Sequence, residues 1–370
     1  MKIPLSRPDI TQREIKEVIG VLKTPYLSLG PKQAEFQKKF AAYIGTKYAE
    51  VVSSGTAGLH ILMKSFGIGK GDEVITTPYS FIASANCILF TQASPVFVDI
   101  DVQTFNIDAE KIEEKITSKT KAILVVHVFG MPADMPKINR IAKKHGLIVI
   151  EDACEALGAG INGKKVGAFS DAAVFAFYPN KQITTGEGGM VVTNKKSIAD
   201  NCRSLKNQGR GPQGSFVQLG YNYRLSDINC ALGVAQLARI NSSLKKRKEV
   251  AQVYKEQLKN FQGLKPLCER KGYERSWFVY VIKLSDQFKR NHKFKMLRLL
   301  AKKGIECGDY FSAIHLTPFY QKMFGFKRGD FPIAEKIADR TLALPFHNKL
   351  KKKEIIEVCR ELVKFLNKNG

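Results

Sequence analysis

The stretch LIVIEDACEALGA, residues 147–159, decides the fold. Its first half is a short apolar and β-branched run, and it follows an amphipathic segment at residues 135–145. A strand after a helix is the repeating unit of an open α/β sheet. The run ends on Glu151 and Asp152, which places acids at the carboxyl edge of the sheet, where such folds bind ligands. A helix cap or a salt-bridged loop acid would explain the same two residues.

Similar units extend outward on both sides of this stretch. Apolar and β-branched runs typical of strands occupy residues 50–53, 73–76, 96–99, 122–127 and 172–177. Segments with apolar residues at helical spacing occupy residues 55–66, 80–90, 108–116 and 198–205. This alternation predicts an α/β domain with a mostly parallel sheet that is covered on both faces.

The two ends of the chain add further elements. Thr11 and Glu14 form a capping box ahead of a helix that we expect to pack on the larger unit. One long helical pattern covers residues 226–259, and a strand (277–284), a helix (293–303) and a closing helix (352–366) follow. We predict a large domain over residues 1–250 and a small α+β domain over residues 251–370.

Hydrophobic content, cysteine spacing and net charge limit the classes of protein to which this chain can belong. The 370 residues are 44% hydrophobic, and no apolar run reaches the length of a membrane span, so we predict a cytoplasmic protein. The seven cysteines are scattered without CxxC spacing, so neither a disulfide framework nor a metal site is expected. The net charge of +25 predicts anionic partners. Nucleic acid and a nucleotide-linked small molecule both fit, although the diffuse excess is typical of a solvated surface.

The segment SSGTAGLH, residues 53–60, joins a predicted strand to a predicted helix. The first turn of a helix leaves N–H groups unpaired and carries partial positive charge, which suits a phosphate. Gly55 permits close approach, while Thr56 and Ala57 could donate N–H groups. An ordinary N-cap would use the same residue types.

The segment FAFYPNKQITTGEGGMVVTN, residues 175–194, places Lys181 in a turn before a glycine cluster and another predicted strand. A lysine can form a Schiff base when burial or nearby positive charge lowers its pKa, and Phe175, Phe177 and Ile183 offer an apolar setting. The glycines do not form a dinucleotide fingerprint, because a strand rather than a helix follows them.

These pieces, in this order, resemble the DegT/DnrJ/EryC1/StrS family of sugar aminotransferases, which depend on pyridoxal phosphate (PLP). The resemblance runs from LSRPDI (5–10) to DRTLALPFHNKL (339–350). It is most specific in SSGTAGLH, EDACEALGA, FAFYPNKQITTGEGGMVVTN and LGYNYRLSDINCALGVAQL (219–237). It implies the aspartate-aminotransferase-like fold, PLP fold type I.

The resemblance also implies roles for individual residues. Lys181 matches the lysine that carries PLP as a Schiff base, and Asp152 matches the acid that pairs with the pyridine nitrogen. A carboxylate there keeps the ring protonated and able to withdraw electrons. Thr56 and Ala57, beside Gly55, match the turn that holds the cofactor phosphate.

Further matches and departures follow. Phe81 matches an aromatic residue that stacks on the cofactor ring. Asn222 matches an asparagine that reaches the phosphate of the neighbouring subunit, which implies a homodimer with shared active sites. Many relatives have glutamine or histidine where Glu155 stands near the cofactor, and serine where Ala176 stands. How the ring hydroxyl is contacted therefore stays open, and the phosphate relies more on backbone N–H groups.

The substrate implied by the resemblance is a nucleotide-linked keto sugar. ITTGEGGM (183–190) and AIHLTPFYQKMFGFKRGDFPIAE (313–335) look most like enzymes that act on 4-keto-6-deoxyhexoses, such as perosamine synthases. Tyr310, His315 and Arg224 could reach this substrate. A packing tyrosine, a core-facing histidine and a structural ion pair are the alternatives.

The expected reaction is a two-stage amino transfer that yields an amino sugar. An amino acid, expected to be glutamate, first leaves its amino group on the cofactor, and the keto sugar then receives it. Lys181 moves the proton between substrate and cofactor. Some relatives with histidine at this position are dehydratases. A PLP lyase or dehydratase, or an enzyme for a non-sugar keto substrate, is the nearest alternative, and a basic nucleic-acid-binding protein is a remote one.

Overall fold

The computed structural model describes residues 2–265 and 267–369. Its centre is a seven-stranded sheet in the order β1-β9-β8-β5-β4-β2-β3. Neighbours from β8 to β3 run parallel, whereas β9 pairs antiparallel with both β1 and β8. The bounds are β1 Tyr48–Val52, β2 Glu73–Thr76, β3 Ser94–Phe97, β4 Thr120–Val126, β5 Ile148–Asp152, β8 Ala172–Ala176 and β9 Gly189–Thr193. The predicted mostly parallel α/β sheet is confirmed.

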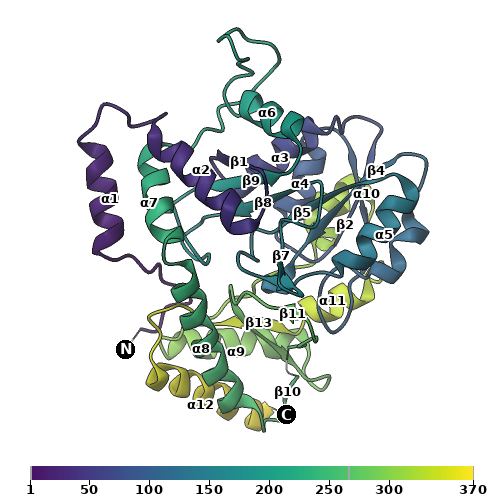
Figure 1. Cartoon of the computed structure of the whole chain (residues 1–370). Coiled ribbons are helices and arrows are strands. Elements are labelled where there is room, and N and C mark those ends of the chain that lie inside the picture. The colour runs from purple at the N-terminus through teal and green to yellow at the C-terminus, as the bar shows by residue number, and fades with distance from the viewer. Residues whose placement is uncertain (1, 266, 370) are drawn as a thin grey trace.

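Helices cover both faces of this sheet (Figure 1). One face packs on α2 (Pro31–Ile44), α5 (Met135–His145) and α7 (Asp227–Leu237). The other face packs on α3 (Gly55–Ser65), α4 (Ala83–Leu89) and α6 (Lys196–Leu205). Side chains alternate between these two layers along each strand, which leaves the carboxyl ends of the strands as the open edge.

The N-terminal helix α1 spans Gln12–Leu22 and packs on α7, as expected. Its capping box is present, because the Thr11 N–H donates to Glu14 Oε2 (2.7 Å) while the Thr11 side chain caps the first turn. Glu14 also accepts from Gln236 (2.9 Å) and from Arg239 (2.6 Å). The capping acid therefore anchors α1 to the larger unit as well.

Two helix predictions are wrong. The single pattern predicted over residues 226–259 is two helices, α7 and α8 (Ile240–Leu258), because Arg239 leaves helical geometry (φ −119°, ψ 16°) and its guanidinium bonds Glu14. The segment predicted as a helix at 108–116 forms two 3-10 turns, Ala109–Lys111 and Glu113–Lys115. The Lys111 N–H donates to the Asp108 carbonyl (3.1 Å) and the Lys115 N–H to the Ile112 carbonyl (3.0 Å), so each turn closes over three residues instead of four.

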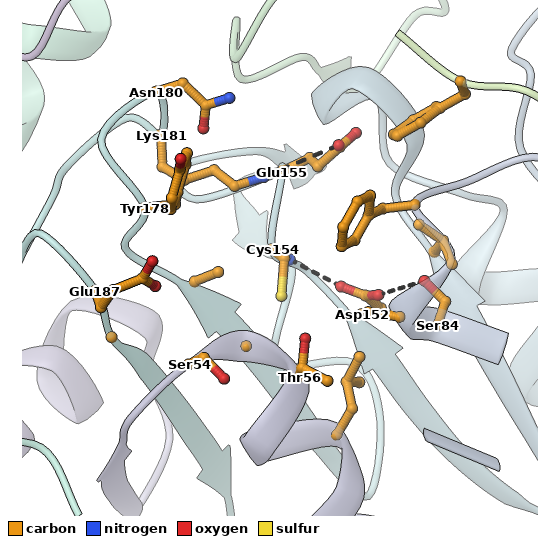
Figure 2. A pocket seen from close by; sticks show the side chains of 18 of the residues that line it. Ser54, Thr56, Ser84, Asp152, Cys154, Glu155, Tyr178, Asn180, Lys181 and Glu187 are labelled. Carbon is orange, nitrogen blue, oxygen red and sulfur yellow. Dashed lines mark hydrogen bonds and ion pairs between the residues drawn. The ribbon is translucent and has the colours of Figure 1, made fainter. Parts of the chain in front are cut away.

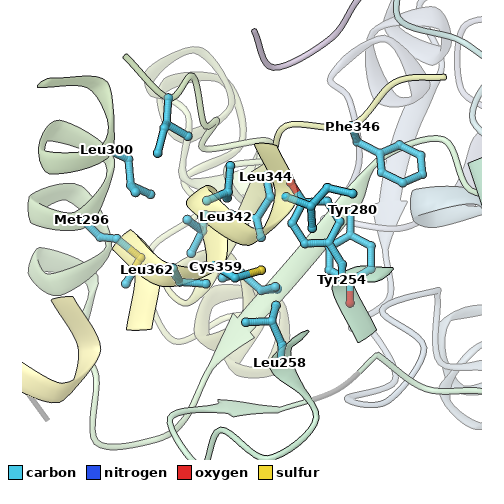
Figure 3. Packing of buried hydrophobic residues seen from close by; sticks show 14 of the residues in the cluster. Tyr254, Leu258, Tyr280, Met296, Leu300, Leu342, Leu344, Phe346, Cys359 and Leu362 are labelled. Atoms are coloured by element: carbon cyan, nitrogen blue, oxygen red, sulfur yellow. The ribbon is translucent and has the colours of Figure 1, made fainter. Parts of the chain in front are cut away.

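A second, smaller unit is built around its own hydrophobic cluster (Figure 3). The antiparallel strands β10 (Leu264–Lys265), β12 (Tyr280–Leu284) and β13 (Thr341–Leu344) pack against α8, α9 (Arg290–Lys302) and α12 (Lys352–Asn369). Tyr254 and Leu258 of α8 belong to this cluster, and so does Ile3 from the N-terminal segment. Both chain ends lie at this end of the molecule (Figure 1). The boundary at residue 250 stays a prediction.

Short elements join the two units. A three-stranded sheet pairs β6 (Gly160–Ile161) with β7 (Lys164–Lys165) and with β11 (Tyr273–Glu274). Two helices, α10 (Pro318–Phe324) and α11 (Pro332–Ala338), precede β13. The 3-10 turns Val128–Gly130 and Ile314–Leu316 complete the described elements. Among residues 2–265 and 267–369, no helix is long and apolar enough to cross a membrane.

Candidate active site

A cavity of about 530 Å³ lies at the carboxyl edge of the sheet (Figure 2). Its floor includes Val126, Asp152 and Ala176, which are the last residues of β4, β5 and β8. The N-terminus of α3 forms one wall, and Tyr310 and Phe311 approach from the smaller unit. Ligands bind in this position in open α/β sheets.

Asp152 is 6% exposed and points into this cavity. The Ser84 hydroxyl donates to its Oδ2 (2.7 Å), and the Cys154 N–H donates to its Oδ1 (3.2 Å), as Figure 2 shows. In the described part of the chain, no Lys, Arg or His lies within 4.0 Å of its oxygens. A buried carboxylate is costly without a positive partner, so this site suits a ligand that brings a protonated nitrogen.

Lys181 faces Asp152 across the cavity, from the turn after β8 (Figure 2). Its Nζ lies 4.0 Å from Glu155 Oε1 and 4.1 Å from the centre of the Phe278 ring, and its side chain is 14% exposed. Arg247, which is buried, donates to the Lys181 carbonyl (3.0 Å) and to that of Phe278 (3.0 Å). The backbone of the turn that carries Lys181 is therefore fixed, and the amine extends from it into the cavity.

The three residues predicted to surround this lysine with apolar side chains lie elsewhere, so that prediction is wrong. Phe175 and Phe177 lie in the layer under the opposite face of the sheet, where their rings pack against Phe40 of α2. Ile183 belongs to the same layer. Phe278 provides the apolar contact instead, and its distance from Lys181 along the chain left no local signal for it.

Glu155 is buried at the back of the cavity, with 5% of its surface exposed. Its Oε2 accepts the Phe129 N–H (2.9 Å), and Oε1 faces Lys181. Burial raises the pKa of Glu155 to about 7, the positive charge of Lys181 opposes this shift, and the negative charge of Asp152 adds to it. The carboxyl group is thus poised to titrate near neutrality.

The turn at the start of α3 forms a cup at the cavity wall. A Cβ on Gly55 would lie 2.8 Å from Cys154 Sγ and 2.9 Å from Ala176 Cβ, so only glycine fits there. Ser54 caps the helix, with its Oγ accepting the Ala57 N–H (3.1 Å). Gly55, predicted to permit close approach, and Thr56, a predicted phosphate donor, line the cavity, whereas the N–H of Ala57, the other predicted donor, is already engaged by this cap.

Aromatic side chains close the cavity mouth. Phe81 lines it and is 63% exposed, and Tyr178 lines it from the Lys181 turn. Tyr310 is half-buried on the side of the smaller unit, and its hydroxyl accepts from Asn180 Nδ2 (3.1 Å). Burial raises the pKa of Tyr310 well above its usual value, so it is a neutral phenol near pH 7.

Other predicted site residues lie outside this cavity. His315 is fully buried in the smaller unit and pairs through Nε2 with Glu335 (2.9 Å). The core-facing alternative for this histidine is thus the one observed. Arg224 donates to Asn207 (3.0 Å), and Asn222 is exposed, with a backbone bridge to the same residue.

Glu151 was expected beside Asp152 at the ligand-binding edge of the sheet, but its side chain does not line the cavity. Alternation along β5 turns it away from Asp152, and it is fully buried. It accepts from His127 (2.9 Å), the Gly167 N–H (2.7 Å) and the Ser170 hydroxyl (2.7 Å). Its role here is to organise the turn before β8.

Sequence reasoning missed several residues of the site. Ser84, Cys154, Asn180 and Phe311 line the cavity, and Arg247 fixes the Lys181 turn from α8. Ser84 stands three residues after Phe81, and Cys154, Asn180 and Phe311 stand within two residues of Asp152, Lys181 and Tyr310, so these four had a local signal. Arg247 comes into place only through tertiary packing.

Comparison with known proteins gives a consistent result. The model of the DegT/DnrJ/EryC1/StrS aminotransferase family matches residues 8–363. GDP-perosamine synthase of Escherichia coli O157:H7 is 38% identical over 371 residues, covering 98% of each chain. Helicobacter pylori PseC, an aminotransferase involved in the biosynthesis of pseudoaminic acid, is 30% identical with a TM-score of 0.95 over 100% of both chains.

A further solved structure bears on the cofactor. Spr1654 of Streptococcus pneumoniae, in its PLP-form, is 27% identical with a TM-score of 0.95, again over 100% of both chains. The fold class and the cofactor predicted from the sequence agree with these relatives. The chain belongs to the DegT/DnrJ/EryC1/StrS aminotransferase family of PLP-dependent enzymes.

Proposed function

We propose that the cavity holds PLP between Asp152 and Lys181 and that the enzyme aminates a nucleotide-linked keto sugar. The observation that carries this proposal is the pairing of two groups in one cavity. Among the described residues, Asp152 is a buried carboxylate without a positive partner, and Lys181 is a primary amine held over an aromatic ring. The pyridinium nitrogen of PLP would pair with Asp152, and the aldehyde of PLP would react with Lys181.

The remaining walls fit the other parts of the cofactor. The N–H groups of Gly55 and Thr56 at the start of α3 would hold the phosphate, since a helix N-terminus favours anions. Ala57 would contribute only if its N–H were released from Ser54. Phe81 would stack on the ring, and Ala176 gives the phosphate no hydroxyl, so backbone donors carry more of its binding.

The side chains divide the chemical work. PLP, when bound, accepts the electron pair released at the reacting carbon. Asp152, fixed by Ser84, keeps a proton on the bound nitrogen and so supports that electron withdrawal. Lys181 would attach the cofactor at rest, and its freed amine would move a proton between the substrate and cofactor carbons. Phe278 and Phe311 limit the access of water.

We infer that the acceptor is a nucleotide-linked 4-keto-6-deoxyhexose and that glutamate is the donor. The likeness to GDP-perosamine synthases at 34–38% identity supports the sugar class. The net charge of +25 would favour a substrate with a pyrophosphate. Tyr310 is the predicted substrate residue that lines the cavity, where its hydroxyl can donate to a sugar oxygen. His315 is left out because it lies in the core.

We further propose a homodimer in which Asn222, with Arg224 beside it, completes the site of the partner subunit. Asn222 is exposed and lies outside the cavity of its own chain. Exposed apolar side chains include Leu219 (83%), three residues before Asn222, and, after α1, Tyr26 (57%) and Leu29 (50%). Such residues are typical of a surface that another subunit covers.

The test measures the amination of a defined panel of nucleotide-linked keto sugars. The purified protein is incubated with PLP, glutamate and UDP-, GDP- and dTDP-linked keto sugars, and products are detected by mass spectrometry. We expect an amino sugar from at least one panel member and none with Lys181→Ala. If no sugar is aminated while glutamate still loses its amino group, the sugar assignment is wrong. Elimination of a hydroxyl instead would indicate the dehydratase alternative.

A further inference from the structure

Glu155 and Lys181 form an ion pair inside the cavity, and no step of the proposed amination uses the Glu155 carboxyl group. Glu155 Oε1 lies 4.0 Å from Lys181 Nζ, and the exposed fractions of the two side chains are 7% and 14%. Water screens so buried a pair poorly, so the charge on either side chain strongly affects the other. Figure 2 shows the contact at the back of the cavity.

The backbone around Phe129 fixes which oxygen of Glu155 faces the lysine. The Phe129 N–H donates to Oε2 (2.9 Å), and Arg275 donates to the Phe129 carbonyl (3.1 Å). The neighbouring Val128 N–H donates to Asn106 (2.8 Å). Phe129 has a positive φ of 52°, a conformation that these bonds sustain. Oε2 is therefore occupied, and Oε1 is left for Lys181.

The other titratable groups near Glu155 do not change charge near neutrality. Burial raises the pKa values of Tyr79, Tyr310 and Cys154, so these three side chains stay neutral. Asp152 contributes a negative charge that raises the pKa of Glu155. Near pH 7, the proton on Glu155 is thus the one that is gained or lost beside Lys181.

We propose that Glu155 is a positioning residue that stores the proton of Lys181, so that the two side chains share one proton whenever the amine is free. The proton leaves the Nζ ammonium and joins Glu155 Oε1. One N–H bond breaks, one O–H bond forms, and the net charge of the pair stays the same. The flexible lysine stem allows Nζ to close the 4.0 Å gap.

This inference rests on the proposed role of Lys181 as a proton carrier. A base must be neutral before it can accept a proton from the substrate carbon. Transfer to Glu155 makes the amine neutral without releasing a charge into water or leaving one unpaired in the cavity. Glu155 then returns the proton when Lys181 must act as an acid.

The test measures the reactivity of Lys181 in the full chain without added cofactor. Trace acetylation is run from pH 5 to pH 10, and labelling of Lys181 is read by peptide mass spectrometry. Only the neutral amine reacts. A pair that shares a proton titrates in two coupled steps, so the wild-type profile should show two rises separated by a plateau that begins near pH 7.

Glu155→Gln keeps an acceptor for Phe129 but cannot store a proton, so its profile should be a single rise. Glu249→Gln, on the exposed face of α8, is the matched control and should keep the plateau. A single rise in the wild type, or the same two-step profile in Glu155→Gln, would overturn the inference. If Glu155→Gln does not fold, the wild-type profile still decides.

A separate measurement keeps this test distinct from the proposed function. Borohydride reduction of the holoenzyme fixes the cofactor to the lysine that holds it. A plateau together with cofactor fixed on a different lysine would support the shared proton and contradict the proposed function alone.

Discussion

Replacing Gly130 with alanine should loosen the joint between the two units beside the active site. Gly130 has a left-handed φ of 74°, and a Cβ there would lie 1.8 Å from the Ser276 carbonyl oxygen. Real Cβ atoms essentially never come closer than 3.0 Å to another atom, so Ser276 must move. That movement breaks the bond from the Ser276 N–H to the Gly130 carbonyl (2.9 Å). It also strains the bond from Gln182 to the Ser276 hydroxyl (2.9 Å).

The expected loss in the free energy of unfolding follows from the strained backbone and the two weakened hydrogen bonds. The left-handed conformation costs an alanine about 1 to 2 kcal/mol. Two weakened hydrogen bonds add about 1 kcal/mol each, for a total of about 3 to 4 kcal/mol. Gly146→Ala is the matched control, because Gly146 has a similar φ of 66° but no atom within 4 Å of the added Cβ. It should cost only the conformational part, about 1 to 2 kcal/mol.

Urea denaturation of both variants at one pH measures the difference in the free energy of unfolding. Gln182 follows Lys181 directly, so cofactor affinity should fall in Gly130→Ala and stay unchanged in Gly146→Ala. Equal destabilisation of the two variants would refute the reasoning, because it would mean that Ser276 moves without cost.

Three further predictions concern single side chains. Glu155→Gln should stabilise the protein at pH 8 but not at pH 4, as urea denaturation can show. In the folded protein the Glu155 carboxyl group keeps its proton up to about pH 7, whereas in the unfolded chain it loses the proton near pH 4.5. Ionisation of Glu155 therefore lowers the free energy of unfolding by about 3 kcal/mol at high pH. His315→Gln should lower the free energy of unfolding by about 1 to 2 kcal/mol, because Glu335 loses the hydrogen bond from His315 but keeps those from the Gly329 and Phe331 N–H groups, with amination per folded molecule unchanged. An equal mixture of Lys181→Ala and Asn222→Ala, refolded together, should regain about a quarter of wild-type amination, since half the dimers are mixed and each has one intact site. No recovery would argue against shared sites.

The elements that were predictable from the sequence depend on local patterns. The strand at residues 73–76 and the helix at 135–145 have the expected bounds, because alternation and helical spacing are local properties. The break at Arg239 was not predictable, because it depends on Glu14, a distant partner on α1.

In the candidate site, too, the residues with a local sequence signal were predictable and those that depend on distant contacts were not. Lys181, Asp152 and Gly55 were found from motif order, and the structure brings them to one cavity. The contact of Lys181 with Phe278 was not found, because the two residues meet only when the smaller unit packs on the larger one. The cytoplasmic location, the dimer and the amino donor stay predictions.

The central claim is that Lys181 holds the cofactor. The most direct measurement is borohydride reduction of the PLP-loaded protein, followed by proteolysis and peptide mass spectrometry. We expect the reduced cofactor to be fixed on the peptide containing Lys181, and Lys181→Ala to carry none. Cofactor fixed on another lysine, or equal fixation in Lys181→Ala, would contradict it.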